Sequence, residues 1–210
     1  MKSSIQYQYG LDETGKPFHI ESLSEVDRKI YFCPGCTEEM VPVINTERQK
    51  HFRHKNDTCK YETYLHKIAK LVFKFQYEKA LRSNQPLELQ QWAKVSCRKC
   101  DYGPCDLPDK QVTTDLIQTY SKIELEKTDA QFVPDLLLTG KNGEKMYIEI
   151  YVTHPCEQEK IDSRIPIVEF QIEQQADLEL LLGNTIDSRD EKIKVYNLGI
   201  SKTEREATGD

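Results

Sequence analysis

Residues 132–154, with the sequence FVPDLLLTGKNGEKMYIEIYVTH, constrain the fold of this 210-residue chain more than any other stretch. Residues 132–138 form an apolar run interrupted by one acid, Asp135. Residues 146–152 alternate in polarity and also carry one acid, Glu149. The tetrapeptide GKNG between the two runs is typical of a β-hairpin turn. The sequence therefore predicts two antiparallel strands, each bearing a single carboxylate.

The length of the turn decides whether the two acids meet. A two-residue loop at Asn142-Gly143 would pair Glu149 with Leu136, and neighbouring positions on a strand point to opposite faces. A three-residue loop over residues 141–143 pairs Asp135 with Glu149, and Gly143 suits the left-handed conformation that ends such a loop. Two opposed carboxylates repel each other unless a cation lies between them. In this second register we expect Asp135 and Glu149 to hold a divalent metal ion; in the first, Glu149 is an ordinary strand residue.

A second group of candidate ligands lies upstream, where CPGC is followed by HFRH and a further cysteine. A Cys-x2-Cys pair with two later imidazoles or thiols is typical of a closed structural zinc site. Two of the three later residues complete the shell, and the sequence favours the two histidines over the cysteine. The five candidates are Cys33, Cys36, His51, His54 and Cys59.

A further cysteine cluster, CRKC followed by Cys105, predicts a second zinc site in the loop 97–105. Only three ligands are local, Cys97, Cys100 and Cys105, so either Cys156 supplies the fourth or the loop binds no metal.

Composition indicates the cellular compartment in which these sites would bind metal. No run approaches 18 apolar residues, and no apolar segment follows the N-terminus. We therefore expect neither a membrane span nor a secretory signal, and we expect the protein to be cytoplasmic. Seven cysteines in that compartment favour metal binding over disulfides. The net charge of −6 argues against a generally basic nucleic-acid binder. Residues 1–105 nevertheless carry 17 basic and 13 acidic side chains, and this half could contact phosphates.

The remaining pattern predicts a mixed α/β chain. Residues 1–32 read as short strands and turns, and residues 62–82 as an amphipathic helix that either follows a phosphate backbone or presents a solvated basic face. Strands are expected at 87–95, 116–126, 165–172 and 193–198, a short helix up to about residue 164, helical structure at 173–186, and a flexible tail at 201–210. The predicted domains are a zinc-knuckle module at 1–60 and a core at 61–200.

The segments YFCPGC, HFRH, ETYLHKIAK, VPDLLL and IEIYVTHPC, in this order, resemble the competence protein CoiA-like family. Members of that family join a zinc-knuckle segment to a nuclease core of the PD-(D/E)xK superfamily. The resemblance spans roughly residues 30–172. It implies a restriction-endonuclease-like core, in which helices flank a mixed sheet, with Mg²⁺ or Mn²⁺ bound by Asp135, Glu149 and the main-chain carbonyl of Ile150.

The chain departs from the superfamily at one position. A lysine usually follows the glutamate by two residues, and here that position is Tyr151. Lys160, on the helix after His154, is the expected substitute, where it would orient the attacking water or stabilise charge on the phosphate. Tyr151 is expected to position substrate or water, and Glu62 to act as a third acidic group near the metal.

The resulting expectation is a metal-dependent endonuclease, a hydrolase acting on DNA, in DNA uptake or defence against foreign DNA. One alternative is a catalytically inactive, zinc-stabilised nucleic-acid-binding or adaptor module. Another is a subunit that cleaves only with a protein partner in a larger assembly, and an oligomer is compatible with each of these.

Overall fold

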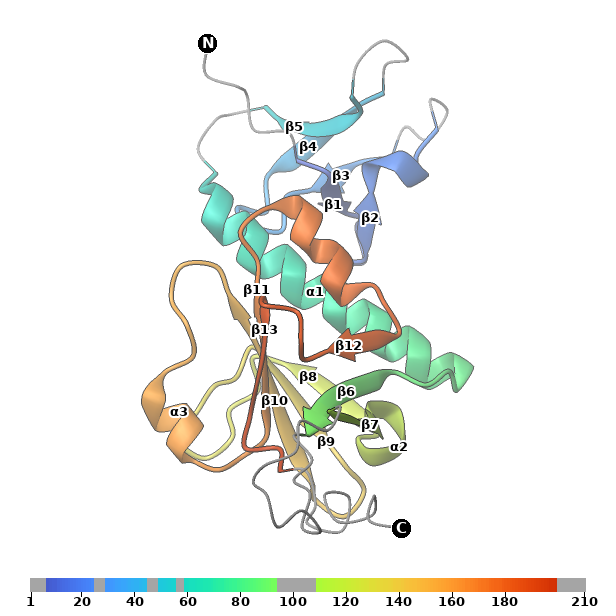
Figure 1. Cartoon of the computed structure of the whole chain (residues 1–210). Helices are drawn as coiled ribbons and strands as arrows, with labels where there is room; N and C mark the ends of the chain where they lie inside the picture. Colours follow the sequence, from blue (N-terminus) through green and yellow to red (C-terminus); the bar gives the residue numbers. More distant parts are fainter. Residues whose placement is uncertain (1–6, 25–28, 45–48, 56–58, 94–108, 200–210) are drawn as a thin grey trace, which may run out of the picture. The chain divides into compact units, whose positions relative to one another are not determined.

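The computed structural model describes residues 7–24, 29–44, 49–55, 59–93 and 109–199. The fold is mixed α/β, with antiparallel and mixed sheets and a few helices (Figure 1). The chain divides into two compact units. The first comprises residues 1–78, 150–155 and 171–182, and the second comprises residues 79–149, 156–170 and 183–210. Among the described helices, none has the length and apolar character needed to cross a bilayer.

The first unit contains a five-stranded antiparallel sheet in the order β2-β1-β3-β4-β5. Aromatic rings fill its core: Phe52 is fully buried and lies 5.1 Å from the ring of Tyr31. A Cβ at Gly10 would lie 3.1 Å from the Phe52 ring and 3.1 Å from Tyr31 Cβ, so this position favours glycine. The strands are β1 (Tyr9–Leu11), β2 (Pro17–His19), β3 (Tyr31–Phe32), β4 (Glu39–Val43) and β5 (His51–His54).

The long helix α1 (Tyr61–Ser83) confirms the amphipathic helix predicted at residues 62–82. Its buried positions recur every three or four residues, as a helix with one apolar face requires; they include Tyr64, Leu65, Ile68, Ala69, Val72 and Phe73. The 3-10 helix η2 (Gln175–Leu181) lies beside α1 in the first unit, where the Tyr64 hydroxyl donates to Gln175 at 2.9 Å. A second 3-10 turn, η1 (Ile20–Ser22), follows β2.

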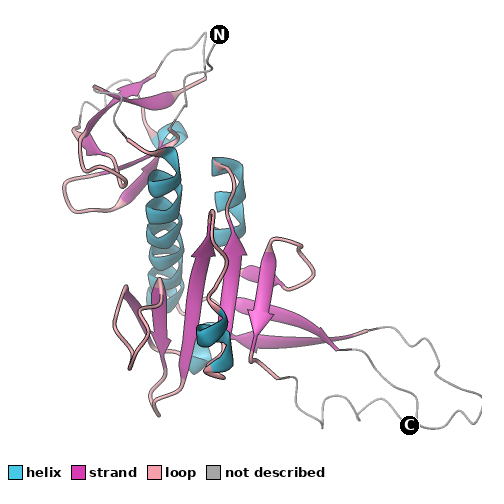
Figure 2. Cartoon of the chain, turned by 90° about the vertical axis from the view of Figure 1, so that its left-hand side faces the viewer, coloured by secondary structure: helices cyan, strands magenta, loops and turns pink. Residues whose placement is uncertain are grey.

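The second unit is built on a five-stranded sheet in the order β13-β11-β10-β9-β8 (Figure 2). Its strands are β8 (Lys122–Leu125), β9 (Leu136–Thr139), β10 (Lys145–Tyr151), β11 (Ile167–Gln171) and β13 (Ile193–Tyr196). The pairs β8–β9, β9–β10 and β11–β13 are antiparallel. Strands β10 and β11 run parallel: the Tyr147 N–H donates to Pro166 and the Ile172 N–H to Tyr151. The sheet is therefore mixed, as predicted.

The helix α3 (Gln158–Asp162) connects β10 to β11 and lies against one face of this sheet (Figure 2). Leu137, Tyr147 and Ile167 form a buried cluster on that face, and Ile161 and Ile165 pack against it. These three sheet residues lie on adjacent strands with the same inward orientation. The connection after β10 is thus held on the face that also carries Glu149.

A smaller sheet completes the second unit, with β6 (Glu88–Ala93) between β7 (Lys110–Asp115) and β12 (Thr185–Asp187). Strand β6 lies within the predicted strand 87–95, but β7 was not predicted from the sequence. Strand β12 pairs with β6 in parallel, whereas β7 pairs with it antiparallel.

Two predicted elements differ from the structure. Residues 116–126 were expected to be one strand, but they begin with the short helix α2 (Leu116–Thr119), because the Asp115 carboxylate accepts the N–H of Ile117 at 3.2 Å and caps it. Residues 173–186 were expected to be helical, but the helical part ends at Leu181 and Thr185–Asp187 joins β6. The predicted tail 201–210 lies outside the described residues.

Candidate metal centres

The β9–β10 hairpin has the register that brings the two predicted carboxylates together. Lys145 pairs with Thr139 and Ile148 with Leu136, and this register continued by one residue sets Glu149 opposite Asp135. The loop is closed by the Gly140 N–H, which donates to the Glu144 carbonyl at 2.8 Å. Gly143 has φ +88°, the left-handed conformation expected for the end of a three-residue loop. The three-residue loop is confirmed, and the two-residue loop is excluded.

Lys160 contacts this pair from α3, the helix that connects β10 to β11. Its ammonium donates to Glu149 Oε1 at 2.9 Å, and both side chains are about nine-tenths buried, each 10% exposed. A buried lysine needs such a partner, because an unpaired ammonium out of water is costly. Lys160, on the helix after His154, was expected to return to Glu149, and the structure confirms that contact.

Burial dominates the titration of Glu149. It raises the pKa of the Glu149 carboxyl to about 7, and the negative charges of Asp135 and Glu169 add to the rise. The Lys160 ammonium opposes this shift without cancelling it. A cation that adds positive charge beside such a carboxyl stabilises its ionised form. Hard divalent cations bind carboxylate oxygens, so Asp135 and Glu149 have the donor chemistry that Mg²⁺ or Mn²⁺ requires.

Glu169 is a neighbouring acid that the sequence analysis did not single out. The parallel pairing of β10 and β11 sets it beside Glu149, and it is 1% exposed. It accepts hydrogen bonds from the main-chain N–H of Cys156 and from the Tyr196 hydroxyl. The available signal was a single acid in the apolar strand IVEFQ, the same signal that identified Glu149.

A separate Cys/His cluster lies in the first unit. Ligand atoms of Cys33, Cys36, His54 and Cys59 all lie within 4.8 Å of one another. The two closest pairs are Cys36 Sγ to His54 Nε2 at 3.3 Å and Cys33 Sγ to Cys59 Sγ at 3.6 Å. The edge of a zinc tetrahedron with sulfur ligands is about 3.8 Å, given a Zn–S bond of about 2.3 Å. These four side chains can therefore hold a zinc ion.

The backbone around the cysteines is arranged as a tight knuckle. The Gly35 N–H donates to Cys33 Sγ at 3.2 Å, and Lys67 of α1 donates to the Gly35 carbonyl at 3.1 Å. A side chain at Gly35 would lie 3.0 Å from Cys59 Sγ, so this position favours glycine. Burial raises the pKa of the Cys33 and Cys59 thiols, which means that zinc would have to displace protons from both.

His51 was expected to be a zinc ligand together with His54, and this preference is wrong. Positions 51 and 54 on β5 differ by an odd number, so their side chains point to opposite faces of the strand. The His51 ring instead faces the Gln49 carbonyl, with Nδ1 at 3.1 Å. Cys59, just before α1, takes the fourth place in the cluster.

The other predicted site residues fall into two groups. Cys97, Cys100 and Cys105 lie outside the described residues, so the second zinc site stays a prediction. Glu62, Ile150 and Tyr151 belong to the first unit, where Glu62 accepts a hydrogen bond from Thr153 at 2.5 Å, and their predicted roles also stay predictions.

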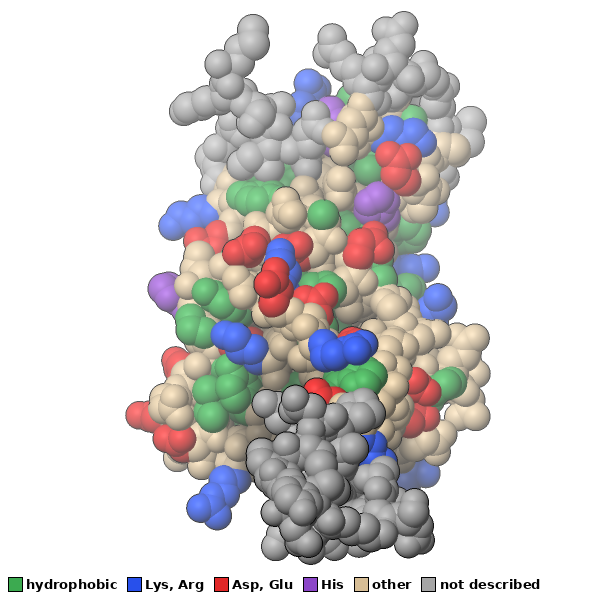
Figure 3. Space-filling view, viewed as in Figure 1, with side chains coloured by type: hydrophobic (Ala, Val, Ile, Leu, Met, Phe, Trp, Pro, Cys, Tyr) green, Lys and Arg blue, Asp and Glu red, His purple; other side chains and the backbone are tan. Residues whose placement is uncertain are grey.

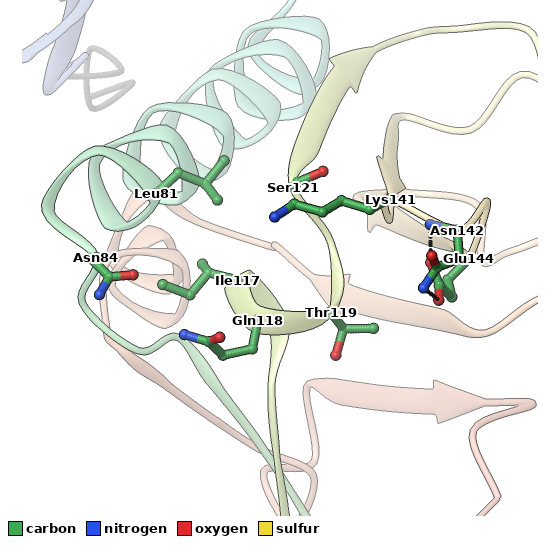
Figure 4. A pocket seen from close by; sticks show the side chains of 9 residues that line it. All are labelled: Leu81, Asn84, Ile117, Gln118, Thr119, Ser121, Lys141, Asn142 and Glu144. Carbon is green, nitrogen blue, oxygen red and sulfur yellow. Dashed lines mark hydrogen bonds between the residues drawn. The ribbon is translucent and has the colours of Figure 1, made fainter.

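A polar pocket in the second unit lies at the other end of the hairpin. Residues of α2, the end of α1 and the β9–β10 turn line it, including Gln118, Ser121 and Lys141 (Figure 4). Glu149 lies five positions after Glu144, which precedes β10, and five positions span about 16 Å at the rise of a strand. This pocket is therefore distinct from the carboxylate pair.

On the face of the molecule in Figure 3, the described Lys and Arg side chains are interspersed with Asp and Glu. No continuous basic band stands out there among the described residues.

Comparison of the chain with protein-family models, with curated proteins and with solved structures finds no match.

Proposed function

We propose that the protein is a metal-dependent nuclease with a restriction-endonuclease-like core, and that Asp135, Glu149 and Lys160 form its active site. One observation carries the proposal: the buried Lys160 ammonium lies 2.9 Å from Glu149, in the register that sets Asp135 opposite. Two carboxylates, one just before β9 and one on β10, can hold a divalent cation, and a lysine of the following helix can stabilise charge on a phosphate.

Each side chain has a distinct task in this proposal. Asp135 and Glu149 supply hard oxygen ligands, and the unpaired Glu149 oxygen remains available while Oε1 accepts from Lys160. Bound by these oxygens, a divalent cation would supply Lewis acidity toward the phosphodiester and toward a water molecule. Lys160 keeps a positive charge beside the site, which stabilises negative charge that develops on the phosphate oxygens. In the hydrolysis, water would lose a proton to solvent and form a bond to phosphorus, while the bond from phosphorus to the sugar oxygen breaks and that oxygen takes up a proton from solvent.

The test is cleavage of plasmid and single-stranded DNA, with RNA as a further substrate, in the presence and absence of Mn²⁺. We expect Asp135→Ala and Glu149→Ala to lose all measurable cleavage, and Lys160→Met to lose about 10²- to 10³-fold in kcat. Asp162→Asn, which removes an exposed acid from the same helix, is the matched control and should cleave like the unmodified protein. Unchanged cleavage in either alanine variant would overturn the assignment.

The ion pair itself favours a second candidate, a nucleic-acid-binding or adaptor module without activity. Lys160 already neutralises Glu149 in part, and Tyr151 occupies the position where the superfamily usually has lysine. Calorimetric titration with Mn²⁺ separates the two functions. A nuclease binds Mn²⁺ in a manner that Asp135→Ala abolishes, whereas the adaptor shows no binding that depends on Asp135.

A further inference from the structure

Glu169 is the buried carboxylate for which the proposed chemistry has no direct use. It lies on β11, and each of its oxygens has a partner: Oε1 accepts from the Cys156 N–H, and Oε2 accepts from the Tyr196 hydroxyl at 3.3 Å. The Lys194 ammonium lies 3.9 Å from Oε2. A carboxylate is costly to bury, so its retention here indicates a specific role for these contacts.

The contact from Glu169 to Cys156 lies directly before α3. Glu157 follows directly as the N-cap residue of this five-residue helix, and no side chain caps it. The Glu157 carbonyl accepts the main-chain N–H of Lys160 at 3.0 Å, which ties the start of the helix to the position of Lys160. A helix of this length has little stability of its own, so contacts to the sheet must hold it in place.

Apolar packing holds both ends of this segment: the Cys156 side chain, before α3, contacts the same buried cluster as Ile161. Ile161 packs against the buried cluster of Leu137, Tyr147 and Ile167, and Asn197 donates to the Ile161 carbonyl. Among the described contacts, the bond from the Cys156 N–H to Glu169 is the hydrogen bond that ties the sheet to the segment before Lys160. Without it, apolar packing of the Cys156 side chain would be left to hold the start of α3, and such packing fixes direction less strictly than a hydrogen bond.

We propose that Glu169 is a positioning residue for Lys160: by binding the Cys156 N–H, it fixes the start of α3 and so holds the Lys160 ammonium on Glu149. The inference about cleavage rests on the proposed nuclease function, whereas the inference about the position of Lys160 does not. Glu169 does not need to touch substrate or metal to act in this way.

Two substitutions separate the hydrogen bond from simple occupancy of space. Glu169→Leu keeps roughly the side-chain volume but removes the acceptor, and Glu169→Gln keeps a carbonyl oxygen that can accept the Cys156 N–H. Glu159→Gln, which neutralises an exposed acid on α3 itself, is the matched control. Far-UV circular dichroism and a single cooperative thermal transition establish that each variant is folded.

The first readout is the rate at which an amine-acylating reagent modifies Lys160, measured by mass spectrometry. Lys160 is 8% exposed and should react slowly in the unmodified protein. We expect at least about a tenfold faster reaction in Glu169→Leu, the change that loss of one hydrogen bond to a charged group produces. Glu169→Gln should protect Lys160 nearly as well as Glu169 does. The proposal would be overturned if Lys160 reacted at the same rate in Glu169→Leu as in the unmodified protein. It would also be overturned if Lys160 reacted at the same rate in Glu169→Leu as in Glu169→Gln.

The second readout is cleavage of DNA with Mn²⁺. In Glu169→Leu, kcat should fall toward that of Lys160→Met, while KM for DNA stays within about twofold, because ground-state binding does not depend on Lys160. Glu169→Gln should recover most of kcat. If the unmodified protein cleaves neither DNA nor RNA, the proposed function fails, but the acylation rates still decide whether Glu169 positions Lys160.

Discussion

At the scale of single residues, Glu149 has neighbours that act on its charge in opposite directions. Burial has the largest effect and raises the pKa of Glu149 to about 7. The charges of Asp135 and Glu169 also disfavour the ionised form, whereas Lys160 favours it. The usual pKa of this carboxyl is 4.5. In the metal-free protein, the contribution of Glu149 to stability is therefore greatest in acid. It declines as the pH rises from the usual value through the raised one, because a buried charge then forms.

Metal binding should have the opposite dependence on pH. A divalent cation must displace the Glu149 proton, so below pH about 7 the affinity for Mn²⁺ should rise about tenfold for each pH unit, and then level off. Calorimetric titration with Mn²⁺ between pH about 5.5 and 8.5 measures this dependence. An affinity that does not change across this interval would show that Glu149 does not release a proton to the metal.

At the scale of elements, the β9–β10 hairpin determines whether a site exists at all. A loop one residue shorter would turn every side chain of β10 to the other face of the sheet, and Glu149 would leave Asp135. Gly143 keeps the loop at three residues by adopting φ +88°, a conformation that side chains with a Cβ rarely adopt. Apart from its two chain neighbours, no atom of the described residues lies within 4 Å of the position that a Cβ would take, so the requirement is conformational rather than steric.

Substitutions of Gly143 should follow this conformational cost. Gly143→Ala should reduce the free energy of unfolding by about 1 kcal/mol, and Gly143→Asn by less, because asparagine tolerates the left-handed region. Urea denaturation measures both values. Equal costs for alanine and asparagine would contradict the conformational explanation.

At the scale of the whole molecule, the two candidate metal centres belong to different compact units. Cys33, Cys36, His54 and Cys59 join β3, β5 and the start of α1 in the first unit, and the carboxylate pair belongs to the second. The sheet of the first unit has short strands, and a bound zinc ion would tie two of its loops to α1. Zinc bound by such a site is worth about 10–16 kcal/mol in small peptides. Loss of the zinc ion should therefore destabilise chiefly the first unit.

Removal of one ligand tests the composition of this centre. Cys59→Ser should abolish stoichiometric zinc binding and lower the thermal midpoint, whereas His51→Gln should retain full zinc content, because His51 lies outside the cluster. Elemental analysis and differential scanning calorimetry measure the two effects. Loss of zinc in His51→Gln, or its retention in Cys59→Ser, would show that the ligand set is different.

Local pattern was sufficient for several parts of this protein. The hairpin with its three-residue loop, the helix α1 and the pair Cys33 and Cys36 all follow from neighbouring residues, because turn chemistry and side-chain periodicity act over a few positions. The same reasoning identified Asp135 and Glu149 as opposed acids. Residues 116–119 were predicted wrongly, because a single cap from Asp115 outweighed the strand pattern.

Only the tertiary structure decided which distant residues meet. Strand parity removed His51 from the zinc cluster and left the fourth place to Cys59, a choice that spacing alone did not make. The parallel pairing of β10 with β11 brought Glu169 beside Glu149, although 20 positions separate them in the chain. The physical reason is common to both cases: spacing limits which side chains can approach, but sheet register and packing determine which of them share a face.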